Sequence, residues 1–218
     1  MAEPVLPLRR EGNPEVRLVG SAWRAPQLMR GVVTPQLVPT MATDRPEPWL
    51  RGPLSAIPAV LQPVGHAFVA ALEDVERAVT DVSPGQLWAQ PGGITPLGFH
   101  LAHLAGSTDR LLTYARGGPL SETQRTALAR ERTIADERPS LDRLLATWRA
   151  TIDRALGQLT STPESVLSEP RLVGRAQLPS TVLGLLFHAA EHASRHTGQV
   201  VTTSKLVRGL TDLPSVAV

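Results

Sequence analysis

Histidines are concentrated in two short segments of this 218-residue chain. His188, His192 and His196 recur every four residues near the C-terminus, and His100 and His103 lie in the stretch GFHLAHLAGSTDRLLTYARG. In a helix, residues four apart lie on the same face, so two such imidazoles can bind one divalent ion. A third imidazole from a neighbouring helix would give a three-histidine site with one open coordination position. The histidine spacing therefore predicts a metal site.

The spacing of the three C-terminal histidines limits which of them can bind the same ion. Each step of four residues rotates by about 40° around the helix axis, so His188 and His196 are about 80° apart. The ion would be bound either by His188 with His192 or by His192 with His196. His192 belongs to both pairs and is the residue most strongly indicated.

The other segment offers two candidates for the third ligand. His100 lies near the centre of the apolar face made by Leu97, Leu104 and Leu111, whereas His103 lies at its flank. Helical periodicity therefore favours His100, although a site near the edge of a bundle could use either histidine.

A competing motif overlaps the C-terminal histidines. The residues from His188 to His192 match the HxxEH pattern of inverted zinc proteases, with Glu191 as the acidic residue. That class needs a further acidic ligand downstream, and Asp212 is the one acidic residue after His196. We therefore interpret the match as accidental, because a five-residue motif without its structural context carries little information.

Four segments carry apolar residues at helical spacing and are predicted to be helices of about 20 residues each. Thr95 is expected to cap the second helix and Ser140 the third. The polar stretch 121–138 is expected to hold a short helix, the stretch 161–178 is expected to be a loop, and no segment shows strand-like alternation. The pattern predicts an all-α four-helix bundle, whose core commonly holds metal sites. The predicted helices are 55–80, 95–116, 140–159 and 180–207.

The N-terminal part of the chain has a different composition. Residues 1–53 contain nine prolines without a sustained period, which is typical of irregular segments. We interpret residues 1–45 as an N-terminal extension, either disordered or the product of an upstream start site. Residues 46–210 would then be the bundle domain and residues 211–218 a C-terminal tail.

Composition excludes several functional classes. The chain has no cysteine, so disulfides, thiolate nucleophiles and cysteine zinc sites are excluded. Its pI of about 9.9 arises from a net charge of only +2, and the basic excess lies in residues 1–40. The remainder has equal numbers of acidic and basic residues, so we expect no nucleic-acid partner. We find neither a membrane-spanning run nor a signal peptide, and we expect a cytoplasmic protein.

Two stretches resemble the DinB-like superfamily of small metal-binding helical proteins. The stretch HAAEHASRHTGQVVTTSKLVRG resembles the fourth-helix pattern of two histidines four apart followed by Gly-Gln. The stretch GFHLAHLAGSTDRLLTYARG resembles the second-helix pattern of His-Leu-Ala followed by Asp-Arg-Leu. The resemblance covers about residues 46–210. It implies a four-helix bundle that is often a homodimer and binds one divalent ion.

The resemblance also implies a ligand set. Its patterns align with His103, His192 and His196, so that His103 replaces the His100 favoured by periodicity. His100 and His188 would then line the pocket or hydrogen-bond the ligands. Imidazole ligands suit zinc, nickel or iron, and the sequence does not distinguish between these ions.

Members of the superfamily with known activities imply a function for the chain. They include metal-dependent thiol transferases, so we expect a transferase or hydrolase acting on a small molecule such as a low-molecular-weight thiol. The alternative is a non-catalytic metal-binding or stress-response module. No catalytic residue is singled out. Asp109 and Arg110 follow the second-helix site and could bind substrate, but we favour their interpretation as solvated ion pairs. Tyr114 is interpreted as either a pocket donor or a core residue.

Overall fold

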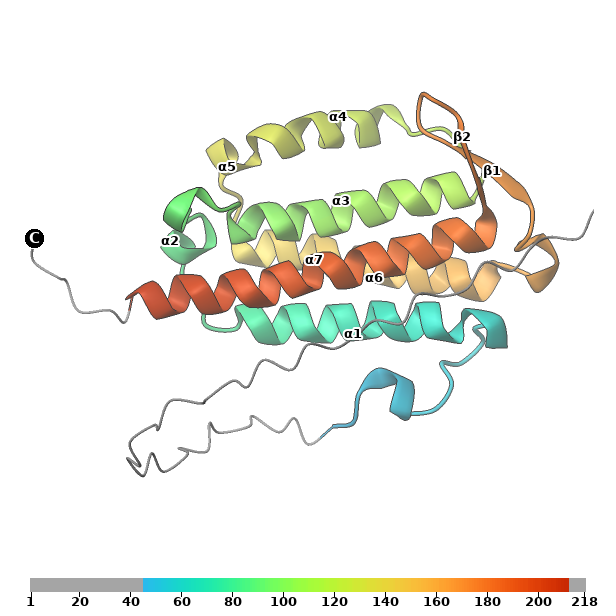
Figure 1. Ribbon diagram of the computed structural model, residues 1–218, viewed down its shortest axis with the longest axis horizontal. Coiled ribbons are helices and arrows are strands. Elements are labelled where there is room, and N and C mark those ends of the chain that lie inside the picture. The colour runs from blue at the N-terminus through green and yellow to red at the C-terminus, as the bar shows by residue number, and fades with distance from the viewer. Residues whose placement is uncertain (1–44, 212–218) are drawn as a thin grey trace, which may run out of the picture. The chain divides into compact units, whose positions relative to one another are not determined.

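The computed structural model describes residues 45–211, in which four long helices form a bundle (Figure 1). The predicted all-α fold class is confirmed. The predicted extension 1–45 and tail 211–218 lie outside the described residues, apart from Arg45 and Thr211. In the following list α marks an α-helix, β a strand and η a short 3-10 helix. The elements are η1 Pro48–Leu50, η2 Ala59–Leu61, α1 Gln62–Val79, α2 Pro84–Leu87, η3 Pro91–Gly93, α3 Leu97–Ala115, α4 Glu122–Arg130, η4 Glu131–Thr133, α5 Ile134–Glu137, α6 Leu141–Ser161, η5 Glu164–Val166, β1 Pro170–Val173, β2 Leu178–Thr181 and α7 Val182–Thr211.

The four long helices pack in a ring. Helices α1 and α3 each pack against both α6 and α7. Figure 1 shows that α1 and α7 run in one direction and that α3 and α6 run in the opposite direction. Because α3 and α6 run in the same direction, the chain must return along the bundle between them.

A crossover makes this return. Helix α4, the turn η4 and helix α5 run back along the outside of α3, which they contact (Figure 1). The predicted short helix in the polar stretch 121–138 is therefore present, as α4 and α5. Ser121 begins α4 with a capping box, in which its hydroxyl accepts a hydrogen bond from the backbone N–H of Gln124.

Local signals explain most helix boundaries. Helix α1 begins at Gln62 rather than near residue 55, and Pro63 lies in its first turn, where the missing N–H leaves no intrahelical bond unmade. Ser140 caps α6 as predicted, by accepting a hydrogen bond from the backbone N–H of Arg143. The expected cap at Thr95 was wrong, because Pro96 is the N-cap of α3 and no side chain caps that helix.

The stretch predicted to be a loop between α6 and α7 contains a β-hairpin. Strands β1 and β2 are antiparallel, with Pro170 opposite Thr181 and Val173 opposite Leu178. Each strand has four residues, too few for alternation to be recognised in a segment rich in proline and polar residues. The expectation of no strand was therefore wrong for this segment, although the bundle is unaffected.

The core is built from the inward stripes of the four long helices. Among the described residues, no helix is both long and apolar enough to cross a membrane. The apolar stripes are buried toward one another, as expected for helices that stabilise each other by tertiary packing. The largest fully buried side chains on these helices are Phe68 and Val75 of α1, Leu97, Leu101, Leu104 and Leu112 of α3, Trp148, Ile152 and Leu159 of α6, and Leu186 of α7.

Two phenylalanines test this description of the core. Phe68 is fully buried, whereas 60% of Phe187 is exposed. We expect Phe68→Ala to lower the free energy of unfolding by about 3–5 kcal/mol, because it removes buried apolar surface and leaves a cavity. Phe187→Ala is the matched control and should change stability by less than about 0.5 kcal/mol. Urea unfolding followed by circular dichroism measures both, and equal losses would contradict the assigned core.

Candidate metal centre

Two adjacent helices bring three histidines together. His103 lies on α3, while His192 and His196 lie one turn apart on α7, which packs along α3. One nitrogen from each of the three side chains lies within 4.8 Å of the other two. All three residues are partly exposed, so the group is accessible from solvent. Within residues 45–211 no other cluster of metal-ligating side chains has this geometry.

The geometry of the group suits one divalent ion. The Nε2 atoms of His103 and His192 are 3.1 Å apart, and the ring of His196 is centred 4.5 Å from each of the other two rings. Two nitrogens bound to one tetrahedral zinc at ~2.0–2.1 Å would lie about 3.3 Å apart. Small side-chain rotations would therefore let the three imidazoles bind the same ion.

A carboxylate from the crossover orients His103. Nδ1 of His103 is 3.0 Å from Oε2 of Glu131, which lies in η4. Because an ionised carboxylate can only accept a hydrogen bond, Nδ1 carries the hydrogen, and the lone pair of the neutral ring is left on Nε2. Nε2 is also the atom that lies beside His192. A carboxylate behind a histidine is the usual partner of a metal-binding imidazole.

Glu131 has a second hydrogen-bonding partner, Arg110, and the absence of a side chain at Gly106 of α3 leaves room for its carboxylate. Arg110 donates to both carboxylate oxygens, through Nη1 to Oε1 and through Nη2 to Oε2 at 3.3 Å. Both side chains are 11% exposed. Gly106 lies beneath the carboxylate, and a Cβ at this position would meet Oε1 of Glu131 and lie 2.9 Å from Nη1 of Arg110. The lack of a side chain at Gly106 therefore allows Glu131 to reach His103.

The electrostatics of the site favour the forms that bind metals. Burial raises the pKa of Glu131, but hydrogen bonds from His103 and Arg110 and the charge of Arg110 outweigh it, so the pKa is lowered overall. Burial, followed by the nearby His103, lowers the pKa of His192. Burial and the neighbouring histidines lower the pKa of His196 to about 4. His192 and His196 are therefore neutral at pH 7, which is the ligand form of imidazole.

The two remaining candidate histidines lie outside the group. His100, which periodicity favoured, is buried beside His196 with ring centroids 5.9 Å apart, but it is not one of the three clustered residues. Periodicity identified the side of α3 that faces the core, whereas His103 lies on the side that faces α7 and η4. Burial lowers the pKa of His100, and its Nδ1 has no hydrogen-bond partner in the described part of the chain.

His188 and the HxxEH motif lie on the surface. Half of the His188 side chain is exposed, and its Nδ1 lies 3.3 Å from Oε2 of Glu191. Glu191 also forms an ion pair with Arg195 on the next turn. The ion pairs hold Glu191 beside solvent-exposed side chains rather than at the clustered histidines. This placement agrees with the interpretation of the motif as accidental.

The polar residues that follow His103 on α3 have different environments. Arg110 was expected to form a solvated ion pair, but its side chain is largely buried against Glu131. Asp109 is partly exposed, accepts a hydrogen bond from Gln124 at 2.6 Å and pairs with Arg154 at 3.4 Å. Tyr114 packs against the hydrophobic core. The interpretation as a solvated ion pair therefore fits Asp109 but was wrong for Arg110.

Sequence reasoning did not identify Glu131. The residue lies in a charged stretch between Arg130 and Arg132 and is 28 positions from His103. A stretch of charged residues is typical of a solvated surface, so Glu131 did not stand out. Helical spacing relates only residues within one helix, so it could not connect Glu131 with His103. Gly106, three residues after His103, was the available signal for a close approach, because glycine is unfavourable within a helix.

Comparison with known proteins places the chain in a family. No curated protein matches the sequence significantly. The DinB superfamily matches residues 67–200, which extend from α1 to α7 and include the three clustered histidines and Glu131. The helical bundle and the histidine group fit a metal-binding protein of this kind. The chain belongs to the DinB superfamily.

Proposed function

We propose that this protein is a metal-dependent enzyme that binds one divalent ion through His103, His192 and His196. The observation that supports this most is the convergence of three imidazole nitrogens within 4.8 Å of one another, beside a carboxylate that holds His103 at Nδ1. Zinc, nickel and iron are the proposed ions, because imidazole nitrogens suit all three.

The arrangement supports chemistry at an accessible site. Three protein ligands leave at least one coordination position for a substrate or water. About a fifth of the His103 side chain is exposed, so a small molecule can reach the group from solvent. A bound divalent ion would lower the pKa of a coordinated thiol or water and so supply a nucleophile at neutral pH.

A low-molecular-weight thiol is the proposed substrate class, and the proposed reaction is conjugation of the whole thiol, through its sulfur, to an electrophile that loses a leaving group, or hydrolysis of a small metabolite. Membership of the DinB superfamily supports this choice. In this chain, Glu131 would orient His103, and Arg110 would keep Glu131 ionised and in place. A homodimer in the cytoplasm stays a prediction from the sequence.

Metal content tests the ligand set. We expect about one ion per chain in protein purified without a histidine tag, and we expect His192→Ala to lose it. Removing a direct ligand should weaken binding by more than the roughly 10–100-fold that loss of an outer partner costs. His188→Ala is the matched control, since His188 lies one turn away on the same helix but outside the group. Elemental analysis and zinc titration measure both variants, and no binding by the native protein would refute the site.

The role of Glu131 can be measured without an activity assay. Glu131→Gln should weaken zinc binding by about 10–100-fold, because an amide is a poorer acceptor for the Nδ1–H of His103. Glu191→Gln, next to His192 in sequence but paired with Arg195 at the surface, should bind zinc normally. Gly106→Ala should also weaken binding, because its Cβ would displace the Glu131 carboxylate. Zinc affinities are compared after circular dichroism shows each variant folded, and equal affinities would exclude this role.

A thiol-transfer assay tests the reaction. With zinc- or nickel-loaded protein, we expect faster conjugation of cysteine or a related small thiol to the electrophile 1-chloro-2,4-dinitrobenzene. The acceleration should be absent in His192→Ala and present in His188→Ala, because only the first variant removes a proposed ligand. The absorbance of the conjugate measures the rate. Metal binding without any thiol-dependent acceleration would contradict the proposed transfer while leaving the metal site intact.

A further inference from the structure

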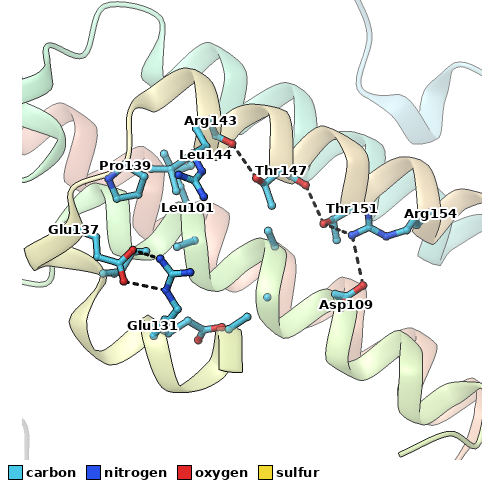
Figure 2. Close-up of a pocket in the computed structure, with 16 residues that line it drawn as sticks. Leu101, Asp109, Glu131, Glu137, Pro139, Arg143, Leu144, Thr147, Thr151 and Arg154 are labelled. Atoms are coloured by element: carbon cyan, nitrogen blue, oxygen red, sulfur yellow. Dashed lines mark hydrogen bonds and ion pairs between the residues drawn. The ribbon is translucent and has the colours of Figure 1, made fainter. Parts of the chain in front are cut away.

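The crossover encloses a cavity that is separate from the clustered histidines. The cavity has a volume of about 290 Å³ and lies between α3, the α4–α5 crossover and α6 (Figure 2). None of the three histidines lines it. Glu131 lies in its wall, so this residue separates the cavity from His103. The volume is at the lower end of the range found for small-molecule sites.

The middle of the cavity is apolar. Small residues on α3, Ala102, Ala105 and Gly106, provide the space, and Leu101 and Leu144 are buried beneath it. A surface of this kind favours a hydrocarbon group over water. An occupant that fits the cavity would therefore be a compact molecule with an apolar body.

One end of the cavity has an excess of positive charge. Arg130 uses Nε and Nη2 to bind both oxygens of Glu137, and no other described residue binds its Nη1. Arg143 also lines this end, and across residues 45–211 its guanidinium forms no hydrogen bond or close ion pair, although its positive charge helps to lower the pKa of Glu137. Figure 2 shows Arg143 and Glu137 on the same side of the cavity. Glu131, which also lines the cavity, is neutralised by its ion pair with Arg110. Arg130, Arg143 and Glu137 therefore leave one positive charge at this end.

The other end of the cavity is neutral. Arg154 pairs with Asp109 at 3.4 Å and donates to the hydroxyl of Thr151 at 2.9 Å (Figure 2). Asp109 is also bound by Gln124. Both charges are therefore already paired, and an anionic group of a ligand would favour the end with Arg130 and Arg143.

We propose that this cavity binds a small organic monocarboxylate, with its hydrocarbon part against α3 and α6 and its carboxylate between Arg130 and Arg143. Guanidinium groups bind carboxylates through paired, charge-assisted hydrogen bonds, which supply both affinity and orientation. The site requires no metal ion and therefore goes beyond the function proposed above.

Phenylacetate is a suitable probe, because it combines a compact apolar body with one carboxylate. Isothermal titration calorimetry on the full-length protein should show saturable binding of one phenylacetate per chain. Arg143→Gln should weaken it by about tenfold, as expected for the loss of a charge-assisted hydrogen bond. Arg143 is exposed, so this substitution leaves the core intact. Arg149→Gln is the matched control, because Arg149 lies on the same helix but pairs with Glu76 away from this cavity.

Two further measurements separate the cavity from the metal centre and from non-specific binding. His192→Ala should bind phenylacetate as the native protein does, which distinguishes this site from a carboxylate bound at the metal. Phenylacetamide, which has the same body without the charge, should bind at least about tenfold more weakly. Absence of saturable binding, equal binding by Arg143→Gln and native protein, or loss of binding in His192→Ala would overturn the proposal.

Discussion

The site depends on the contacts of the buried Glu131 carboxylate with His103 and Arg110. A charge in this position is costly to remove from water, and the structure offsets the cost with Arg110 on one side and His103 on the other. The same contacts attach the crossover to α3, because Glu131 belongs to η4 and both of its partners belong to α3. The orientation of one imidazole and the position of a connecting segment are therefore set by one side chain. Removing either partner would leave a buried carboxylate with only one of its two partners.

Helix α3 serves the bundle and the site with different faces. Leu97, Leu101 and Leu104 are buried in the core, while His103, Gly106 and Arg110 follow one another at spacings of three and four and meet Glu131. Such spacing keeps residues on one side of a helix. The same rule places His192 above His196 on α7 and opposite His103. The packing of α3 against α7 thus brings His103 of α3 next to His192 and His196 of α7.

The sequence was informative where function follows helical periodicity and less so where it depends on contacts between distant segments. Apolar stripes predicted the four helices because burial of one face is what stabilises a helix in a bundle. Periodicity alone preferred His100 because it detects the side that faces the core, and His100 is indeed buried there. Glu131 could not be predicted, because a carboxylate in a charged stretch is recognisable as a partner of His103 only once the crossover has been placed.

The histidine group also carries an energetic cost that an ordinary helix interface would avoid. Burial and the proximity of other imidazoles disfavour protonation of His192 and His196. Nδ1 atoms of His100 and His196 are buried without hydrogen-bond partners within the described residues, and leaving such a group unpaired costs ~1–3 kcal/mol. Apolar side chains at these positions would seal α3 against α7 without this cost. Local departures of this kind concentrate at functional sites, and a metal ion bound by the lone pairs of His103, His192 and His196 would offset the cost of holding these imidazoles close together.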